Sequence, residues 1–492
     1  MEEVIENIRS ILVHDPVSPM LFNTGLFLVL FVLFFAVYYL VKNRPVLKML
    51  LVITFSLYFY YKSSGWACAI LACVCVSDYL LGRWMEYAVS MFQARLIVLL
   101  NVAVNVGMLV YFKYFNLLGQ AFATITGTGF DPLDIMLPAG ISFFTFRSIS
   151  YIVDVYRGDM KPCHSLLQYA FFLTFFPPLL AGPVVRARDM LPQIEANSNP
   201  TPQMTSEGLF LIMSGLVKKV VIADYISGNF VDRIFDNPAL YSGFENLMGC
   251  VGFTIQIYCD FSGYSDMAIG LALMLGYRFK DNFMAPFKAC NPQDFWRRWH
   301  ISLSTWLRDY IYIPLGGNRR GKFRTYLNNI LTMLIGGLWH GASWMYVLWG
   351  AYHGVLLAIH KAFKGVWRLP AQFAGRKEIR YVNIAVMFVL TVIGFAIFRA
   401  PDLATLTAMA TQITGSFHLS VATQFVGGYM MIVAAMLLGY MMHIAPARWT
   451  AGSRTAYMSM PLIWQSVILA LVLFMIIQVR QSDLVPFIYL QY

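Results

Sequence analysis

Apolar runs of roughly membrane-spanning length recur along almost the whole chain. A helix needs about 20 mostly apolar residues to cross the roughly 30 Å hydrocarbon layer of a bilayer. The runs cover residues 21–41, 48–61, 65–82, 96–112, 134–155, 165–182, 206–226, 244–276, 326–340, 342–360, 381–399, 425–442 and 461–480. This pattern predicts an all-α polytopic membrane protein.

Composition supports the same fold class. The 492 residues are 59% hydrophobic and 12% charged, whereas soluble domains carry roughly a quarter charged residues. A soluble enzyme is therefore excluded. Several runs are short or contain Pro and Gly, which is typical of broken or re-entrant helices, so we expect about eleven transmembrane helices plus shorter re-entrant and interfacial ones. The runs are continuous rather than alternating, so a β-barrel is not expected.

Charges on either side of the first apolar run predict its orientation. Residues 1–20 hold four acidic side chains against a single Arg9, unlike the positively charged start of a signal peptide. Lys42, Arg44 and Lys48 follow the run, and basic residues gather on the cytoplasmic side of a membrane. We therefore expect residues 1–20 to form a short extracytoplasmic N-terminal segment.

The surplus of basic residues, a net charge of +11, is concentrated in two loops without acidic residues. The first loop carries Arg319, Arg320, Lys322 and Arg324, and the second carries Lys361, Lys364, Arg368, Arg376 and Lys377. Both loops are expected to be cytoplasmic. Two interpretations stay open: the charges mark topology only, or they also dock an anionic donor. Charge confined in this way does not predict a nucleic-acid surface.

Residues 291–310 carry the signals of a helix at the membrane interface. Asn291 can cap a helix, Pro292 suits its first position, and Pro314 limits its far end, which predicts one helix over about 292–312. At 100° per residue the apolar side chains fall in one stripe, and His300 lies at its border. The stripe holds Trp296, Trp299, Leu303, Trp306, Leu307 and Tyr310; Arg297, Arg298, Ser304, Arg308 and Asp309 lie off it. Such amphipathic helices lie in the interface.

A second stretch, residues 336–344, places a histidine deep in the membrane. A helix that starts near Tyr326 at the cytoplasmic face climbs about 22 Å to His340, past the middle of the hydrocarbon layer. The next apolar run ends in basic residues again, so a tight hairpin is expected at Gly341 and Ala342. An ionisable residue at this depth is a functional candidate. The alternative is a histidine satisfied by neighbouring carbonyl groups.

These two stretches resemble the membrane-bound O-acyltransferase (MBOAT) family, in particular its branch of alginate O-acetylation proteins and teichoic acid D-alanyl transfer proteins. The resemblance rests on Phe295–Asn318, on the Leu338-Trp339-His340-Gly341 turn, on Tyr258–Asp266 and on the tail Pro486–Tyr492. In the tail, Leu490 and Tyr492 stand where phenylalanines are expected. The resemblance implies a single MBOAT domain over 1–492, with helices in a ring around a thin central septum and a catalytic core at 291–360.

The resemblance also implies site residues. His340 corresponds to the family's catalytic histidine and His300 to its second polar residue. Acyl transfer to a hydroxyl needs a base with a pKa near 7, which a neutral imidazole provides. We expect His340 to be this base, and His300 either to orient or polarise a thioester or to be a packing residue. Further candidates for substrate binding are Trp339, Asp309, Arg297, Ser304, Asn328 and His353; candidates for donor docking are Arg319, Arg320, Lys322 and Arg324; no metal site is expected.

The predicted function is a membrane O-acyltransferase of the bacterial inner membrane that moves an acyl group, most simply acetyl, from a cytoplasmic thioester to an extracytoplasmic polysaccharide. No tightly bound cofactor is expected; acetyl-CoA or an acyl carrier protein is the co-substrate. The resemblance implies a periplasmic or membrane-anchored partner of the SGNH-hydrolase type. Two alternatives stay open: D-alanyl transfer to teichoic acid, and a polysaccharide or solute transporter, although the paired broken helices of transporters are not found.

Overall fold

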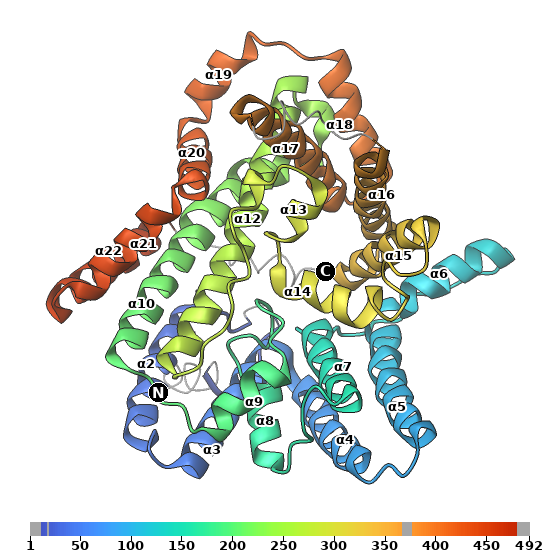
Figure 1. Cartoon of the computed structure of the whole chain (residues 1–492). Helices are drawn as coiled ribbons and strands as arrows, with labels where there is room; N and C mark the ends of the chain where they lie inside the picture. The colour runs from blue at the N-terminus through green and yellow to red at the C-terminus, as the bar shows by residue number, and fades with distance from the viewer. Residues whose placement is uncertain (1–10, 17–18, 367–375, 480–492) are drawn as a thin grey trace. The chain divides into compact units, whose positions relative to one another are not determined.

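The computed structural model describes residues 11–16, 19–366 and 376–479, and this part of the chain folds into helices without strands (Figure 1). Most of the predicted segment 1–20, the tail 486–492 and Arg368 lie outside the described residues. The helices group into two compact units. The first comprises Met1–Leu209 and Met267–Phe279, and the second comprises Phe210–Asp266 and Lys280–Tyr492.

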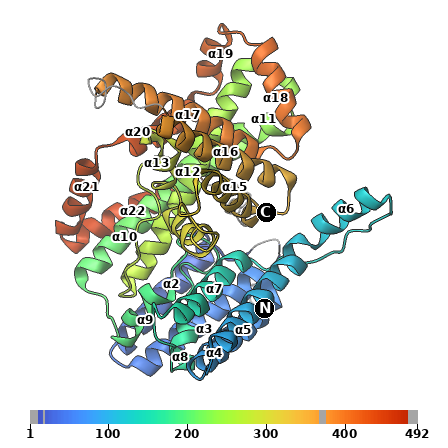
Figure 2. The same ribbon diagram turned by 45° about the vertical axis from the view of Figure 1, so that its right-hand side comes forward.

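The described residues of the first unit form eight helices and one end of each of two others. These are α2 (Gly25–Val41), α3 (Pro45–Ser64), α4 (Cys68–Glu86), α5 (Met91–Leu109), α6 (Phe115–Thr126), α7 (Ile141–Arg157), α8 (Leu166–Thr174) and α9 (Ala187–Glu195), with parts of α10 (Pro202–Leu216) and α12 (Gly243–Met274). Phe176 lies among aromatic rings of α2 and α3, such as Phe34 and Phe55 at centroid distances of 5.9 and 5.1 Å. Helix α6 projects away from the other helices of this unit in both views (Figures 1 and 2).

The second unit carries the predicted catalytic core. It holds α11 (Asp232–Asp236), α13 (Pro292–Trp296), α14 (Ile301–Leu307), α15 (Lys322–His340), α16 (Trp344–Val366), α17 (Lys377–Arg399), α18 (Leu403–Gly415), α19 (Val421–Gly428), α20 (Met430–Ile444), α21 (Ala447–Ser459) and α22 (Leu462–Val479). It also holds three π-helical segments, η3 (Val217–Asp224), η4 (Ser227–Val231) and η7 (Arg308–Tyr312).

Four helical segments of the described chain are long and apolar enough to cross a membrane, and a fifth is added if the bent pair α19 and α20, which meet at 89°, counts as one span. The four are Pro45–Glu86, Met91–Thr126, Lys377–Arg399 and Leu462–Val479. These helices fit a membrane protein. The expected number of about eleven spans is not confirmed.

Charged side chains buried in the second unit are paired. Lys218 Nζ lies 2.7 Å from Asp266 Oδ2, and Lys219 Nζ lies 2.7 Å from Asp224 Oδ1 and 2.9 Å from Asp260 Oδ1. A buried charge is expensive unless an opposite charge compensates it. The pairing joins η3 to α12 and explains how five charged groups are accommodated where these two segments meet.

The predicted hairpin is present: α15 and α16 pack side by side and are joined at residues 341–343 (Figure 2). Glycine makes their close approach possible. A Cβ on Gly350 would lie 2.5 Å from the Met333 carbonyl oxygen, and one on Gly337 would lie 2.2 Å from the Tyr346 carbonyl oxygen. Small residues at such contacts let the backbones of membrane helices touch, and here they fix the position of His340 at the end of α15.

Candidate active site

The predicted single helix over 292–312 is wrong, because the chain breaks between Arg297 and His300. The start is as predicted: the Asn291 side chain accepts a hydrogen bond from the Asp294 N–H at 2.8 Å, and Pro292 is the first helical residue. After α13 the backbone pairs with an earlier segment. Met284 N–H donates to the Arg298 carbonyl, and Ile301 N–H donates to the Asn282 carbonyl, both at 2.9 Å.

His300 therefore does not lie on a helix face but immediately precedes α14. Its φ is +42°, a left-handed conformation that few residues other than glycine adopt. Such a conformation persists only where the surroundings enforce it, and it is common at functional sites. The two backbone hydrogen bonds to the 282–284 segment supply that enforcement and turn the imidazole into the protein interior.

The hydrogen bonds of His300 define its protonation. The residue is fully buried, and its Nδ1 lies 3.2 Å from Asn282 Oδ1. The Ser302 N–H and hydroxyl also donate to this Asn282 atom, at 3.2 and 2.8 Å, which identifies it as the oxygen. His300 Nδ1 must then carry the proton. His300 lies outside the membrane-spanning candidates, and burial lowers its pKa to about 3. At neutral pH its Nε2 is therefore an unprotonated hydrogen-bond acceptor.

His340 is the last residue of α15 and is buried in a cage of aromatic rings. Its ring lies 4.9 Å from that of Trp339, 4.9 Å from that of Trp349 and 5.2 Å from that of Phe398. The Trp339 ring also contacts the His300 ring, at 5.9 Å. The two histidines that sequence analysis selected thus flank the same indole, although their positions along the chain are far apart.

A second group of buried rings lies beside His340, consisting of Trp296, Trp349 and His353. Trp349 contacts His353 at 4.8 Å, Trp296 contacts His353 at 5.1 Å, and the two indoles are 5.7 Å apart. Within the described part of the chain, both His353 ring nitrogens and both indole nitrogens lack a hydrogen-bond partner. Buried polar atoms without partners are rare and need an explanation.

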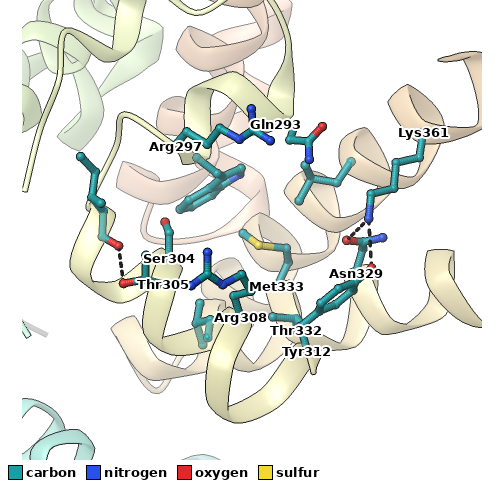
Figure 3. A pocket seen from close by; sticks show the side chains of 14 residues that line it. Gln293, Arg297, Ser304, Thr305, Arg308, Tyr312, Asn329, Thr332, Met333 and Lys361 are labelled. Carbon is teal, nitrogen blue, oxygen red and sulfur yellow. Dashed lines mark hydrogen bonds between the residues drawn. The ribbon is translucent and has the colours of Figure 1, made fainter. Parts of the chain in front are cut away.

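A cavity of about 340 Å³ borders this group through Trp296 (Figure 3). Three cationic side chains, Arg297, Arg308 and Lys361, reach it from different elements, and Lys361 Nζ lies 3.1 Å from both Tyr312 Oη and Asn329 Oδ1. The other lining residues are Gln293, Trp296, Ile301, Ser304, Thr305, Leu307, Tyr312, Asn329, Thr332, Met333 and Leu357. The lining therefore combines apolar side chains with three positively charged ones.

The structure brings some of the predicted binding residues to this cavity and leaves others elsewhere. Arg297 and Ser304 line it, and Trp339 separates the two histidines. Asp309 lies beside the cavity, where its carboxylate pairs with Arg308 at 2.7 Å. Asn328 instead donates to the Leu315 and Gly317 carbonyls and holds that turn.

Other predicted residues lie away from the cavity. His353 is separated from His340 by Trp349. The predicted docking residues, which we call the basic loop (Arg319, Arg320, Lys322 and Arg324), are exposed and do not line the cavity. Sequence reasoning missed Trp296 as a lining residue and Arg308 and Lys361 as its cations. Lys361 was grouped with a loop, whereas it belongs to α16.

Comparison with known proteins decides the family. The family model of the membrane-bound O-acyltransferases matches residues 161–399. The chain is 44% identical over 392 residues to "Probable alginate O-acetylase AlgI" of Pseudomonas putida, and the matched region covers 78% of each chain. The chain belongs to the membrane-bound O-acyltransferase family. It is also 36% identical over 431 residues to "Peptidoglycan O-acetyltransferase" of Helicobacter pylori, 80% of each chain.

A more distant relative within the same family is "Teichoic acid D-alanyltransferase" of Bacillus subtilis, 28% identical over 281 residues and covering 54% of this chain. Family membership makes this protein an O-acyltransferase rather than a transporter. An O-acyltransferase needs a base for the attacking hydroxyl, an approach for the acyl donor and a way to stabilise charge on the carbonyl oxygen. The buried histidines, the cationic cavity and the ring group are the parts from which these can be built.

Proposed function

We propose that this protein transfers an acetyl group from a cytoplasmic thioester to a hydroxyl group outside the membrane, for O-acetylation of an extracytoplasmic polysaccharide. The observation that carries the proposal is the pair of buried histidines, His300 and His340, that flank Trp339 beside a cavity with three cations. The acetyl group is favoured because the relatives with 44% and 36% identity are named for acetyl transfer.

The cavity is the proposed donor site. Its volume of about 340 Å³ falls at the lower end of small-molecule pockets, about 300–1,000 Å³, and suits one part of a large donor such as acetyl-CoA. Arg297, Arg308 and Lys361 would attract the phosphate groups of this donor. An acyl carrier protein with its phosphopantetheine arm offers the same chemistry. Either donor is a co-substrate and not a resident cofactor.

His340 is the proposed general base. It accepts the proton of the attacking hydroxyl while the hydroxyl oxygen bonds to the thioester carbonyl carbon; the C–S bond then breaks, and the thiolate leaves with that proton. His300 has a different task, because its Nδ1–H is engaged with Asn282 and only its Nε2 lone pair is available. It can orient a hydroxyl by accepting a hydrogen bond, but as a neutral imidazole in this tautomer it cannot polarise a carbonyl.

The setting that we propose is the bacterial inner membrane, with the N-terminus outside. The acetyl group then passes from the donor side to an acceptor on the far side. The immediate acceptor is either the sugar or a hydroxyl of a partner protein of the SGNH-hydrolase type, which completes the transfer.

Purified protein in liposomes with radiolabelled acetyl-CoA tests the reaction. We expect thioester cleavage in the wild-type protein, loss of cleavage in His340→Ala, and little change in His164→Ala, whose side chain is 61% exposed. Undiminished turnover in a folded His340→Ala variant would exclude this base.

A parallel assay with a D-alanyl carrier protein separates acetyl from D-alanyl transfer, and cleavage of that thioester alone would replace the acetyl assignment. The acceptor is identified in cells. Mass spectrometry of surface glycans with and without the protein should show acetyl esters that depend on it.

A further inference from the structure

The ring group beside His340 holds four buried nitrogen atoms without hydrogen-bond partners in the described chain: Trp296 Nε1, Trp349 Nε1, and Nδ1 and Nε2 of His353. The three residues are 9%, 2% and 1% exposed. A buried polar group without a hydrogen-bond partner destabilises the folded protein, and here four such atoms lie in one group of rings. Such a cluster of unpartnered atoms points to a bound group that satisfies them.

The chemistry of the two indoles limits what that group is. An indole nitrogen only donates, so its missing partner must be a hydrogen-bond acceptor. Trp296 lines the cavity, and the Trp349 ring contacts both the Trp296 ring, at 5.7 Å, and the His340 ring, at 4.9 Å. The indoles therefore lie between the proposed donor site and the proposed base, where the acyl carbonyl must come to react.

Two groups near the indoles cannot donate a hydrogen bond to a developing oxyanion: the C-terminal end of α15 and the His300 ring. His340 stands at the C-terminal end of α15, where the helix presents carbonyl groups and a partial negative charge rather than N–H donors. His300 offers only the acceptor nitrogen Nε2. An acyl transfer that develops negative charge on the carbonyl oxygen needs positioned donors, and the indole N–H groups are donors with no other partner.

We propose that the indole N–H groups of Trp349 and Trp296 bind the carbonyl oxygen of the acyl donor and stabilise the oxyanion formed there. The inference rests on the proposed function. When the hydroxyl oxygen bonds to the carbonyl carbon, the carbonyl π electrons move to its oxygen, which the indoles hold. The C=O bond then re-forms, the C–S bond breaks, and the thiolate takes the proton that His340 accepted.

Replacement of each indole by 3-benzothienylalanine tests this role, because sulfur replaces the N–H in a ring of nearly the same shape. Loss of one oxyanion donor reduces kcat by about 10²–10³-fold in enzymes. We expect a fall of about 10²-fold in kcat at position 349 and a smaller fall at 296, with little change in KM for acetyl-CoA. Thermal unfolding in detergent should match the wild-type protein, since the shape is kept.

The matched control is the same replacement at Trp299, an indole that is 1% exposed and packs 4.9 Å from Phe395, and whose nitrogen is not among the unpartnered atoms. It should leave kcat unchanged. Wild-type kcat in both the 349 and 296 variants would overturn the proposal and assign the unpartnered nitrogens to buried water. If the wild-type protein cleaves no thioester at all, the proposed function fails and this inference fails with it; if it cleaves thioester, only the indole variants decide.

Discussion

Substitution of Gly350 by alanine should reduce activity much more than it reduces stability. The added Cβ would lie 2.5 Å from the Met333 carbonyl oxygen and 3.0 Å from Leu334 Cα. Both atoms belong to the backbone of α15, so no side chain can turn away. Because ordinary contacts begin at 3.4 Å, α15 and α16 must separate by nearly 1 Å.

The expected loss of stability is modest, because two effects oppose each other. Overpacking destabilises the protein by about 1–3 kcal/mol, and replacement of glycine by alanine inside a helix stabilises it by about 1 kcal/mol. The net destabilisation is then about 0–2 kcal/mol. The effect on activity is larger. His340 ends α15, and a misplacement of about 1 Å at a catalytic group can reduce the rate about 10²-fold.

Gly107→Ala is the matched control, since Gly107 is helical and a Cβ there has nothing within 4 Å. It should raise the unfolding temperature slightly and leave turnover unchanged. The assay is acetyl-CoA cleavage in liposomes beside thermal unfolding in detergent. Turnover of Gly350→Ala equal to that of Gly107→Ala would refute the argument that the glycine contacts position His340.

Three further predictions concern the cavity and its supports. Lys361→Met should raise KM for acetyl-CoA about fivefold, equivalent to about 1 kcal/mol, and this increase should be smaller at high salt. Replacement of all four cations of the basic loop by glutamine should leave KM unchanged. The reverse result would place donor binding at the basic loop. Asn282→Ala removes the hydrogen bond that sets the tautomer of His300 and should lower kcat about tenfold with the KM for acetyl-CoA retained, about the upper value for one hydrogen bond; a change in that KM alone would contradict this. Asn291→Ala removes a helix cap and should destabilise the protein by about 1 kcal/mol, measured by thermal unfolding; an unchanged unfolding temperature would show that the cap of α13 adds nothing.

The hairpin that carries His340 could be predicted because its determinants are local. Fifteen or so apolar residues, glycines at the turn and basic residues at both ends are all visible in a short stretch, and each of them acts on the backbone or on its membrane placement directly. The start of α13 was predictable for the same reason. Asn291 and Pro292 satisfy helix-terminal groups within one turn, and the structure contains both features.

The break at His300 could not be predicted from the same signals. Its determinants are two hydrogen bonds: the Met284 N–H donates to the Arg298 carbonyl, and the Ile301 N–H donates to the Asn282 carbonyl. Met284 and Asn282 precede the stretch by well over a helical turn. Local propensity favours helix throughout 292–312, but tertiary pairing of the backbone overrides it. The tautomer of His300 depends on the same distant segment, so its role as an acceptor also could not be derived from spacing.

The positive charges illustrate the difference between a pattern along the chain and a site in space. The basic loop is conspicuous because its four cations fall within the six residues 319–324, and such a cluster indicates which side of a membrane a loop occupies. Binding requires cations to converge on one volume, and Arg297, Arg308 and Lys361 do so from the α13–α14 turn, from η7 and from α16. These three residues are far apart in the sequence, so no single run of charge marks them. The proposed donor site and the proposed indole donors thus follow from the break at His300 and the glycine contacts of the hairpin, because these two features bring α13, α14, α15 and α16 together.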